Sequence, residues 1–112
     1  SFYMQASFLN NNFEVVKKLA KKIIYDRNSS KIVNNCKSPF CGNAGYAYIF
    51  LLYVSEQEND FENQSKYLSE YNQLNNKYTK AMFIGRTNPA NFIWPNEFKK
   101  IILVMDKLGW HK

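Results

Sequence analysis

The densest hydrophobic run in the chain is Gly45-Tyr46-Ala47-Tyr48-Ile49-Phe50-Leu51-Leu52-Tyr53-Val54, in which nine apolar or aromatic side chains follow one glycine. A helix that is apolar on all sides belongs in a protein core, where neighbouring elements cover it. A buried strand is the alternative, because a short apolar run does not reveal its period. The run has about half of the roughly twenty residues that cross a bilayer, so it predicts no membrane span.

Length and composition favour one domain with a core of its own. The chain has 112 residues, 46% of them hydrophobic, and only four glycines and three prolines. A chain of this size can bury a core unaided. We predict a single all-α domain over residues 1–112, with five or six helices in antiparallel hairpins. The predicted hairpins cover about residues 2–26, 44–75 and 76–108, and a loop over about 26–43 contains the cysteines.

The stretch from Phe13 to Ile24 has the clearest helical period. At 100° per residue its apolar side chains fall in one arc and its lysines in the opposite arc, which predicts an amphipathic helix. The apolar arc consists of Phe13, Val16, Leu19, Ala20, Ile23 and Ile24. The opposite arc consists of Lys17, Lys18, Lys21 and Lys22.

Three further helices are predicted from their start and stop signals. One begins at Phe61, after an N-capping Asn59-Asp60, and runs to about residue 75. A second covers 78–84 and ends at Gly85, since glycine adopts the left-handed cap most easily. The last begins at Pro95, where the missing N–H costs nothing, and runs to about residue 108.

Three helix starts share a pattern that suggests an internal repeat. Asn11-Asn12-Phe13, Asn59-Asp60-Phe61 and Asn96-Glu97-Phe98 each place an asparagine two residues before a phenylalanine. The residues three, six, seven and ten positions after each phenylalanine are apolar, except for Gln64. Repetition of a helical hairpin explains this pattern. Any capped amphipathic helix that starts with phenylalanine would explain it equally well.

Two of these junctions resemble those of a known family. Residues 6–14 (Ala-Ser-Phe-Leu-Asn-Asn-Asn-Phe-Glu) and residues 46–53 followed by 59–62 (Asn-Asp-Phe-Glu) are similar to the junction between the two helices of a tetratricopeptide repeat. The resemblance implies stacked helical hairpins over residues 1–75, with a degenerate third unit in 76–108. The three phenylalanines lie 48 and 37 residues apart, against a family period of about 34. The resemblance implies no ligand site.

The charges are segregated along the chain. Residues 1–40 and 77–112 each hold seven basic and two acidic side chains, whereas residues 41–76 hold one basic and five acidic side chains. An acidic middle segment attracts its own basic neighbours, which weakens the inference of nucleic-acid binding from the net charge of +6. The face of Lys17, Lys18, Lys21 and Lys22 is either a solvated surface or an anion-binding alternative.

Cys36 and Cys41 flank Lys-Ser-Pro-Phe in a segment rich in Asn and Ser. Two thiols this close in a loop form a small disulfide ring in an oxidising compartment, and free thiols are the alternative. Because the chain begins at Ser1 without a methionine, we expect a processed or trimmed product. The expectation of a periplasmic or secreted protein therefore rests on the cysteines.

No motif predicts catalysis, a cofactor or a metal. His111 is the only histidine and lies where chains fray, and Gly42-Asn43-Ala44-Gly45 lacks the lysine and spacing of a phosphate loop. The carboxylates of Glu56, Glu58, Asp60 and Glu62 alternate across a turn. An EF-hand loop counted from Glu56 would need glycine where Phe61 stands, so a solvated turn with capping carboxylates is the better reading.

These features predict a non-enzymatic protein-binding module in an exported setting, with another protein as its partner. The candidate partner-binding residues are those four carboxylates together with Arg86, Phe92 and Trp94 from the irregular segment before the last helix. An immunity or inhibitor protein that neutralises a toxin is one alternative. A basic protein that binds nucleic acid or another anionic surface is the other.

Overall fold

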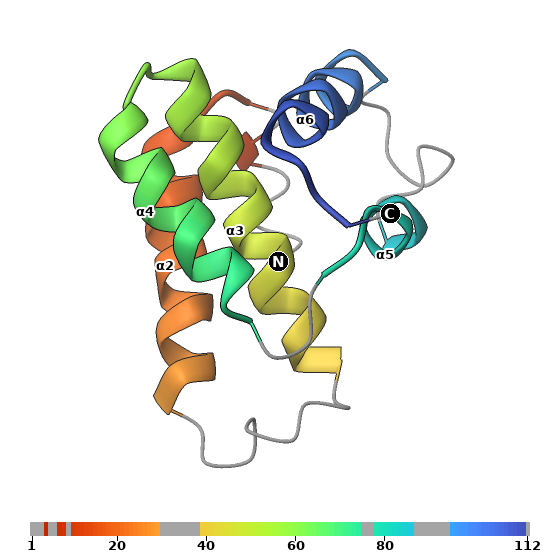
Figure 1. Ribbon diagram of the computed structural model, residues 1–112. Coiled ribbons are helices and arrows are strands. Elements are labelled where there is room, and N and C mark those ends of the chain that lie inside the picture. The colour runs from red at the N-terminus through yellow and green to blue at the C-terminus, as the bar shows by residue number, and fades with distance from the viewer. Residues whose placement is uncertain are drawn as a thin grey trace.

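Helix α3 (Pro39–Gln57) runs through the middle of the molecule, and the other helices pack around it (Figure 1). The computed structural model describes residues 4, 7, 8, 10–29, 39–74, 78–86 and 95–111, and every element in these residues is an α-helix. The predicted all-α class is therefore confirmed. The other helices are α2 (Phe13–Ser29), α4 (Phe61–Asn72), α5 (Lys80–Arg86) and α6 (Pro95–Leu108).

The hydrophobic run forms the centre of the core as a helix, not as a strand. Every residue from Ala44 to Ser55 is buried. Helix α3 packs most extensively against α2, then against α4 and then against α6, so little of its circumference faces solvent. This arrangement explains why its sequence is apolar on all sides. Within the described residues, no helix combines the length and the apolarity needed to span a membrane.

Helix α2 has the predicted two faces. Val16 and Ala20 are fully buried, and the other members of the apolar arc are partly buried against the core. Lys18, Lys21 and Lys22 are exposed on the opposite side. The amphipathic period therefore gives the orientation of α2 correctly.

The turn before α2 is closed by an asparagine with a left-handed backbone. Asn11 has φ 57°, a conformation that only glycine and asparagine adopt at low cost. Its N–H donates to the Phe8 carbonyl at 3.0 Å, and the Asn12 N–H donates to the Ser7 carbonyl at 2.8 Å. These two bonds form a Schellman motif, which ends the preceding helical turn.

The turn before α4 repeats this geometry. Asn59 has φ 56°, its N–H donates to the Glu56 carbonyl at 3.3 Å, and the Asp60 N–H donates to the Ser55 carbonyl at 2.9 Å. Two of the three matching sequence patterns thus share one backbone structure. The third does not, because Asn96 lies inside the first turn of α6.

Three predicted boundaries are wrong. The predicted loop over 26–43 is shorter, because α2 continues to Ser29 and α3 begins at Pro39. Cys41 therefore lies in α3, where the helix starts at a proline that needs no N–H partner. Helix α4 ends at Asn72, not near residue 75. Gly85 lies inside α5 and does not cap it, since its φ is not positive and the helix continues to Arg86.

Helix α5 is joined to the rest of the molecule by aromatic rings. The Phe83 ring stacks on Phe98 of α6 with centroids 5.8 Å apart, and it lies 5.7 Å from Tyr46 of α3. After Leu108, Gly109 takes φ 82° and turns the chain back towards α5. The C-terminal end of the chain consequently lies beside α5 (Figure 1).

Candidate functional site

Glu56, the first carboxylate of the predicted acidic site, binds groups from two other helices. Its Oε1 accepts from Lys107 Nζ of α6 at 2.7 Å, and its Oε2 accepts from Gln64 Nε2 of α4 at 2.9 Å. Gln64 is buried and also donates to the Leu52 carbonyl at 3.2 Å. The polar residue that interrupts the apolar pattern of α4 is thus hydrogen-bonded twice to α3.

The next two carboxylates also interact within the chain. Glu58 Oε1 lies 3.1 Å from Lys17 Nζ, which also binds Glu14 at 2.8 Å. These two partners raise the pKa of Lys17. Asp60 caps α4, because its Oδ1 accepts from the Asn63 N–H at 3.4 Å. We call the turn that carries Glu56, Glu58, Asp60 and Glu62 the acidic turn. Its carboxylates join α2, α4 and α6 at one end of the bundle.

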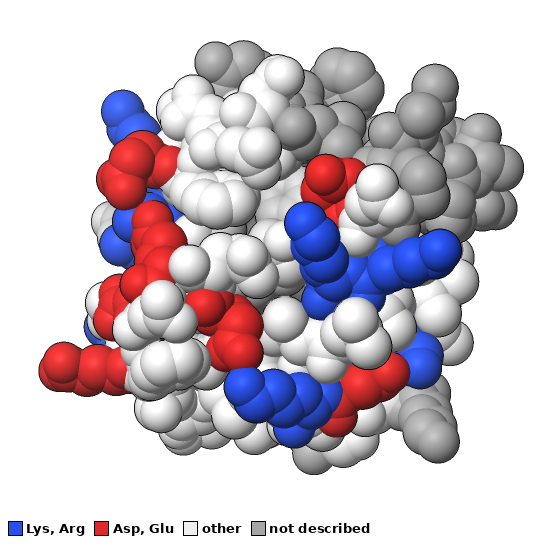
Figure 2. All heavy atoms as spheres, turned by 90° about the horizontal axis from the view of Figure 1, so that it is seen from above, with Lys and Arg blue, Asp and Glu red and all other residues white. Residues whose placement is uncertain are grey.

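The face at this end has no single sign of charge. Figure 2 shows Lys and Arg side chains interleaved with Asp and Glu across it. The described part of this face therefore carries both signs of charge, and opposite charges this close reduce each other's field. Glu62, the fourth predicted carboxylate, is exposed in the first turn of α4, where a negative charge favours the helix dipole.

We expect Glu56→Gln to lower the free energy of unfolding by about 1 kcal/mol at neutral pH. Hydrogen bonds from Lys107 and then Gln64 lower the pKa of Glu56 below its ordinary 4.5. A carboxyl with a lowered folded-state pKa stabilises the fold above its unfolded pKa, and this stabilisation is lost as the pH falls through the folded pKa. Urea unfolding should thus show a difference at neutral pH that shrinks as the pH is lowered through the acidic range. Glu62→Gln is the control and should shift stability by less than about 0.5 kcal/mol. A difference independent of pH would contradict this account of Glu56.

A groove lies between α2 and α4, with α3 beneath it, and it extends at one end to Asn63, which binds Asp60 of the acidic turn. Its volume is about 410 Å³, within the range of small-ligand pockets. The lining residues come from three helices, namely Lys21, Ile24 and Tyr25 of α2, Leu51 of α3, and Asn63, Lys66, Tyr67 and Glu70 of α4. We take this α2/α4 groove as the candidate functional site.

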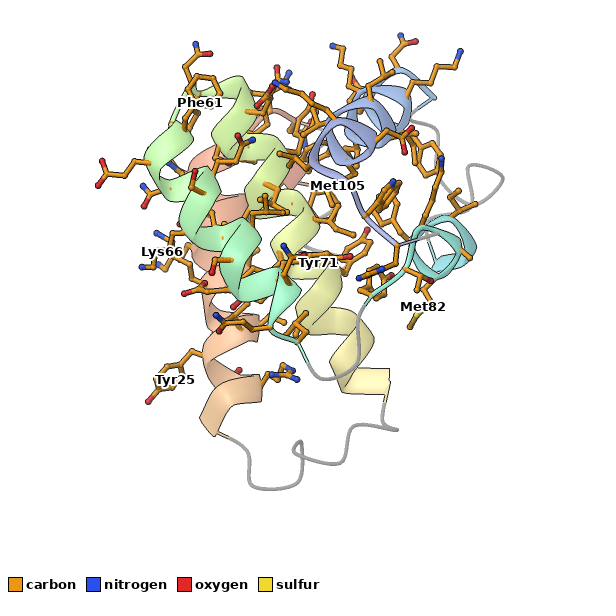
Figure 3. The ribbon with its side chains drawn as sticks, in the orientation of Figure 1. Tyr25, Phe61, Lys66, Tyr71, Met82 and Met105 are labelled. Atoms are coloured by element: carbon orange, nitrogen blue, oxygen red, sulfur yellow. The ribbon has the colours of Figure 1, made fainter. Side chains whose placement is uncertain are left out.

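The two walls of the α2/α4 groove each carry an exposed cation. Lys21 of α2 and Lys66 of α4 are both exposed. Tyr25, one helical turn after Lys21, is 69% exposed although it is a large aromatic side chain. Figure 3 shows Tyr25 and Lys66 pointing outward on the same side of the molecule. An exposed aromatic beside a cavity is a common feature of binding surfaces.

Glu70, the carboxylate in the lining of the α2/α4 groove, interacts with Tyr48 of α3. Burial, and after it the charge of Glu70 and a hydrogen bond with its carboxylate, raise the pKa of Tyr48 to about 12. The Tyr48 phenol is therefore un-ionised at neutral pH and donates to Glu70. Arg27 of α2 also acts on Tyr48 and lowers its pKa. Glu70 is consequently less available to an occupant than Lys21 or Lys66.

Several predicted site residues lie outside this region. Lys17 of α2 binds Glu58 of the acidic turn. Of the four predicted lysines, only Lys21 lines the groove. Arg86 is the last residue of α5, and its side chain lies outside the description. Phe92, Trp94 and Cys36 lie outside the described residues, as does the Cys41 side chain, so the disulfide stays a prediction.

The α2/α4 groove was missed by sequence reasoning, although one signal for it exists. Tyr25 falls close to the lysine arc of α2, so its exposure follows from the helical period. Lys66 and Tyr67 carry no such signal, because their closeness to α2 depends on how α2 and α4 both pack on α3. Among the described residues, no three His, Cys, Asp or Glu side chains gather to hold a metal ion. The chain matches no family model, no curated protein and no solved structure.

Proposed function

We propose that this chain is a non-enzymatic protein-binding module that recognises its partner through the α2/α4 groove. The observation that carries the proposal is Tyr25, a tyrosine 69% exposed at the edge of a cavity of about 410 Å³. Tyrosine is enriched among the residues that contribute most to protein interfaces. The cations on both walls add the polar contacts that give such an interface specificity.

The architecture that would support this surface is a pair of helical hairpins packed as in a tetratricopeptide repeat. The two matching Schellman turns, with Asn11 and Asn59 in the left-handed region, support this part of the proposal. In the first hairpin, Phe13 after the turn packs on Tyr53 of α3 with ring centroids 6.5 Å apart. In the second, the matching Phe61 is 52% exposed, so the two junctions share the backbone turn and differ in the packing of this ring. Stacked helical hairpins leave outer helix surfaces open for a partner.

Affinity capture with matched variants tests the proposal. The tagged chain would be compared with Tyr25→Ala, Lys66→Glu and Lys100→Glu, after circular dichroism has confirmed that each is folded. We expect the wild type and Lys100→Glu to retain a partner protein that both groove variants lose, because Lys100 is exposed on α6, outside the groove lining. A partner retained equally by all four proteins would contradict the assignment to this groove.

A salt titration separates this proposal from the anion-binding alternative. Binding to a polyanion weakens steeply as salt rises, because counterions are released from it. An interface anchored by a tyrosine and two lysines loses affinity much less steeply, because it has few charge pairs and releases few counterions. A retained nucleic acid whose binding disappears with moderate salt would favour the alternative and count against a protein partner.

A further inference from the structure

We propose that the ligand of the α2/α4 groove is an acidic peptide segment that inserts one apolar side chain between the helices. This inference rests on the proposed function and specifies the chemistry of the partner. It follows from two properties of the groove, the charge of its walls and the apolar character of its floor.

The exposed charges in the lining of the groove are positive. They are Lys21 on the α2 side and Lys66 on the α4 side. The carboxylate in the lining, that of Glu70, already interacts with the Tyr48 phenol. An acidic segment would therefore meet cations on both walls. A basic segment would face like charges, which oppose docking.

The floor of the groove suits an aliphatic or aromatic side chain. Leu51 of α3, which is 1% exposed, and the buried Tyr67 of α4 close its bottom, and the half-buried Ile24 of α2 presents apolar surface to an occupant. Water in contact with such a surface is released when an apolar group replaces it. An aliphatic side chain of a peptide can fill such a floor between the helices, whereas a nucleic acid would place its flat bases on an exposed aromatic ring.

The exposed ring of Tyr25 extends the surface on the α2 side. Tyrosine supplies a large, rigid contact area at a low cost in side-chain entropy, and its hydroxyl can bond a peptide carbonyl. Lys17 takes no part, since it is bound to Glu14 and Glu58. The ligand is accordingly placed over the middle of α2 and along α4 between Asn63 and Glu70.

Selection from a random peptide library displayed on phage tests the chemistry without knowledge of the partner. The library would be selected on the wild-type chain and depleted on the double variant Lys21→Glu/Lys66→Glu, which inverts the charge of both walls. We expect the enriched peptides to share Asp or Glu residues on both sides of one apolar residue. Enrichment of basic or uncharged peptides, or no enrichment that depends on the two lysines, would overturn the inference.

Fluorescence anisotropy with one enriched peptide then measures each contribution. Lys21→Glu and Lys66→Glu should each weaken binding by about tenfold, as should replacement of the apolar residue of the peptide by serine. Lys100→Glu makes the same charge change outside the groove and should alter the dissociation constant by less than about twofold. Equal weakening by Lys100→Glu, or tighter binding of a single-stranded oligonucleotide than of the peptide, would refute an acidic-peptide site.

The two proposals fail in different ways. A partner protein lost on Tyr25→Ala, together with no preference for acidic peptides, would leave the protein-binding function standing and remove only the ligand chemistry. A partner that ignores every groove variant would remove the function as well.

Discussion

Trp110→Ala should lower the free energy of unfolding by about 3–5 kcal/mol, the range for truncating a buried aromatic residue. Trp110 is only 8% exposed, and its ring centroid lies 5.6 Å from that of Phe83. Its Nε1–H donates to Asp106 at 2.7 Å, and Lys80 Nζ lies 5.8 Å from its ring centroid. The substitution would therefore remove apolar contact, a charge-assisted hydrogen bond and a cation–π contact together.

Urea unfolding followed by circular dichroism measures this effect, and the next residue supplies the control. His111 is exposed, and its main-chain carbonyl accepts from the Lys80 N–H at 2.5 Å. His111→Ala keeps that carbonyl and should change stability by less than about 0.5 kcal/mol. A loss below about 1 kcal/mol in Trp110→Ala would show that the tail does not hold α5 in place.

Gly45→Ala should destabilise the protein by about 2–3 kcal/mol, although alanine is the better helix former. A Cβ built at Gly45 would lie 2.2 Å from Tyr78 Cβ and 2.6 Å from its Cγ. These atoms are next to the backbone and cannot rotate away. The Tyr71 hydroxyl of α4 donates to the Tyr78 carbonyl and so holds this segment against α4. Either α3 or the Tyr78 segment must shift to admit one methyl group.

Gly85→Ala is the matched control, with an effect of opposite sign. Gly85 is also helical, but nothing lies within 4 Å of the Cβ position. Alanine there should stabilise the protein by about 0.5–1 kcal/mol, because it loses less backbone entropy on folding. Thermal unfolding of the two variants side by side would decide the matter. Similar shifts in both would contradict the close approach at Gly45.

The helical class and the central place of α3 follow from the sequence because they depend on local pattern. A run that is apolar on all sides needs cover on all sides, and the amphipathic period of α2 gives a helix able to provide it. Asp60 before Phe61 marks the start of α4 because its side chain accepts the hydrogen bond that the first turn needs. Each of these features is determined within a few residues.

The features that sequence reasoning missed depend on contacts between helices. Gly85 is the residue type that favours a helix C-terminal cap, but among the described glycines only Gly109 takes a positive φ. Gln64 interrupts the apolar pattern of α4, and the sequence does not show that its side chain donates to Glu56 and to the Leu52 carbonyl. The α2/α4 groove exists because two helices far apart in the sequence pack side by side on α3. Local sequence patterns carry no information about the distance between those two helices.

The central position of α3 also bears on the order in which the chain folds. Its two most extensive partners, α2 and α4, are its neighbours along the chain, whereas α6 reaches it only after the intervening α5 segment. Contacts between neighbours close short loops and form quickly, while distant contacts must first overcome a larger loss of chain entropy. The three-helix unit α2–α3–α4 is thus suited to act as a folding nucleus, on which the aromatic contacts of α5, α6 and the tail assemble later.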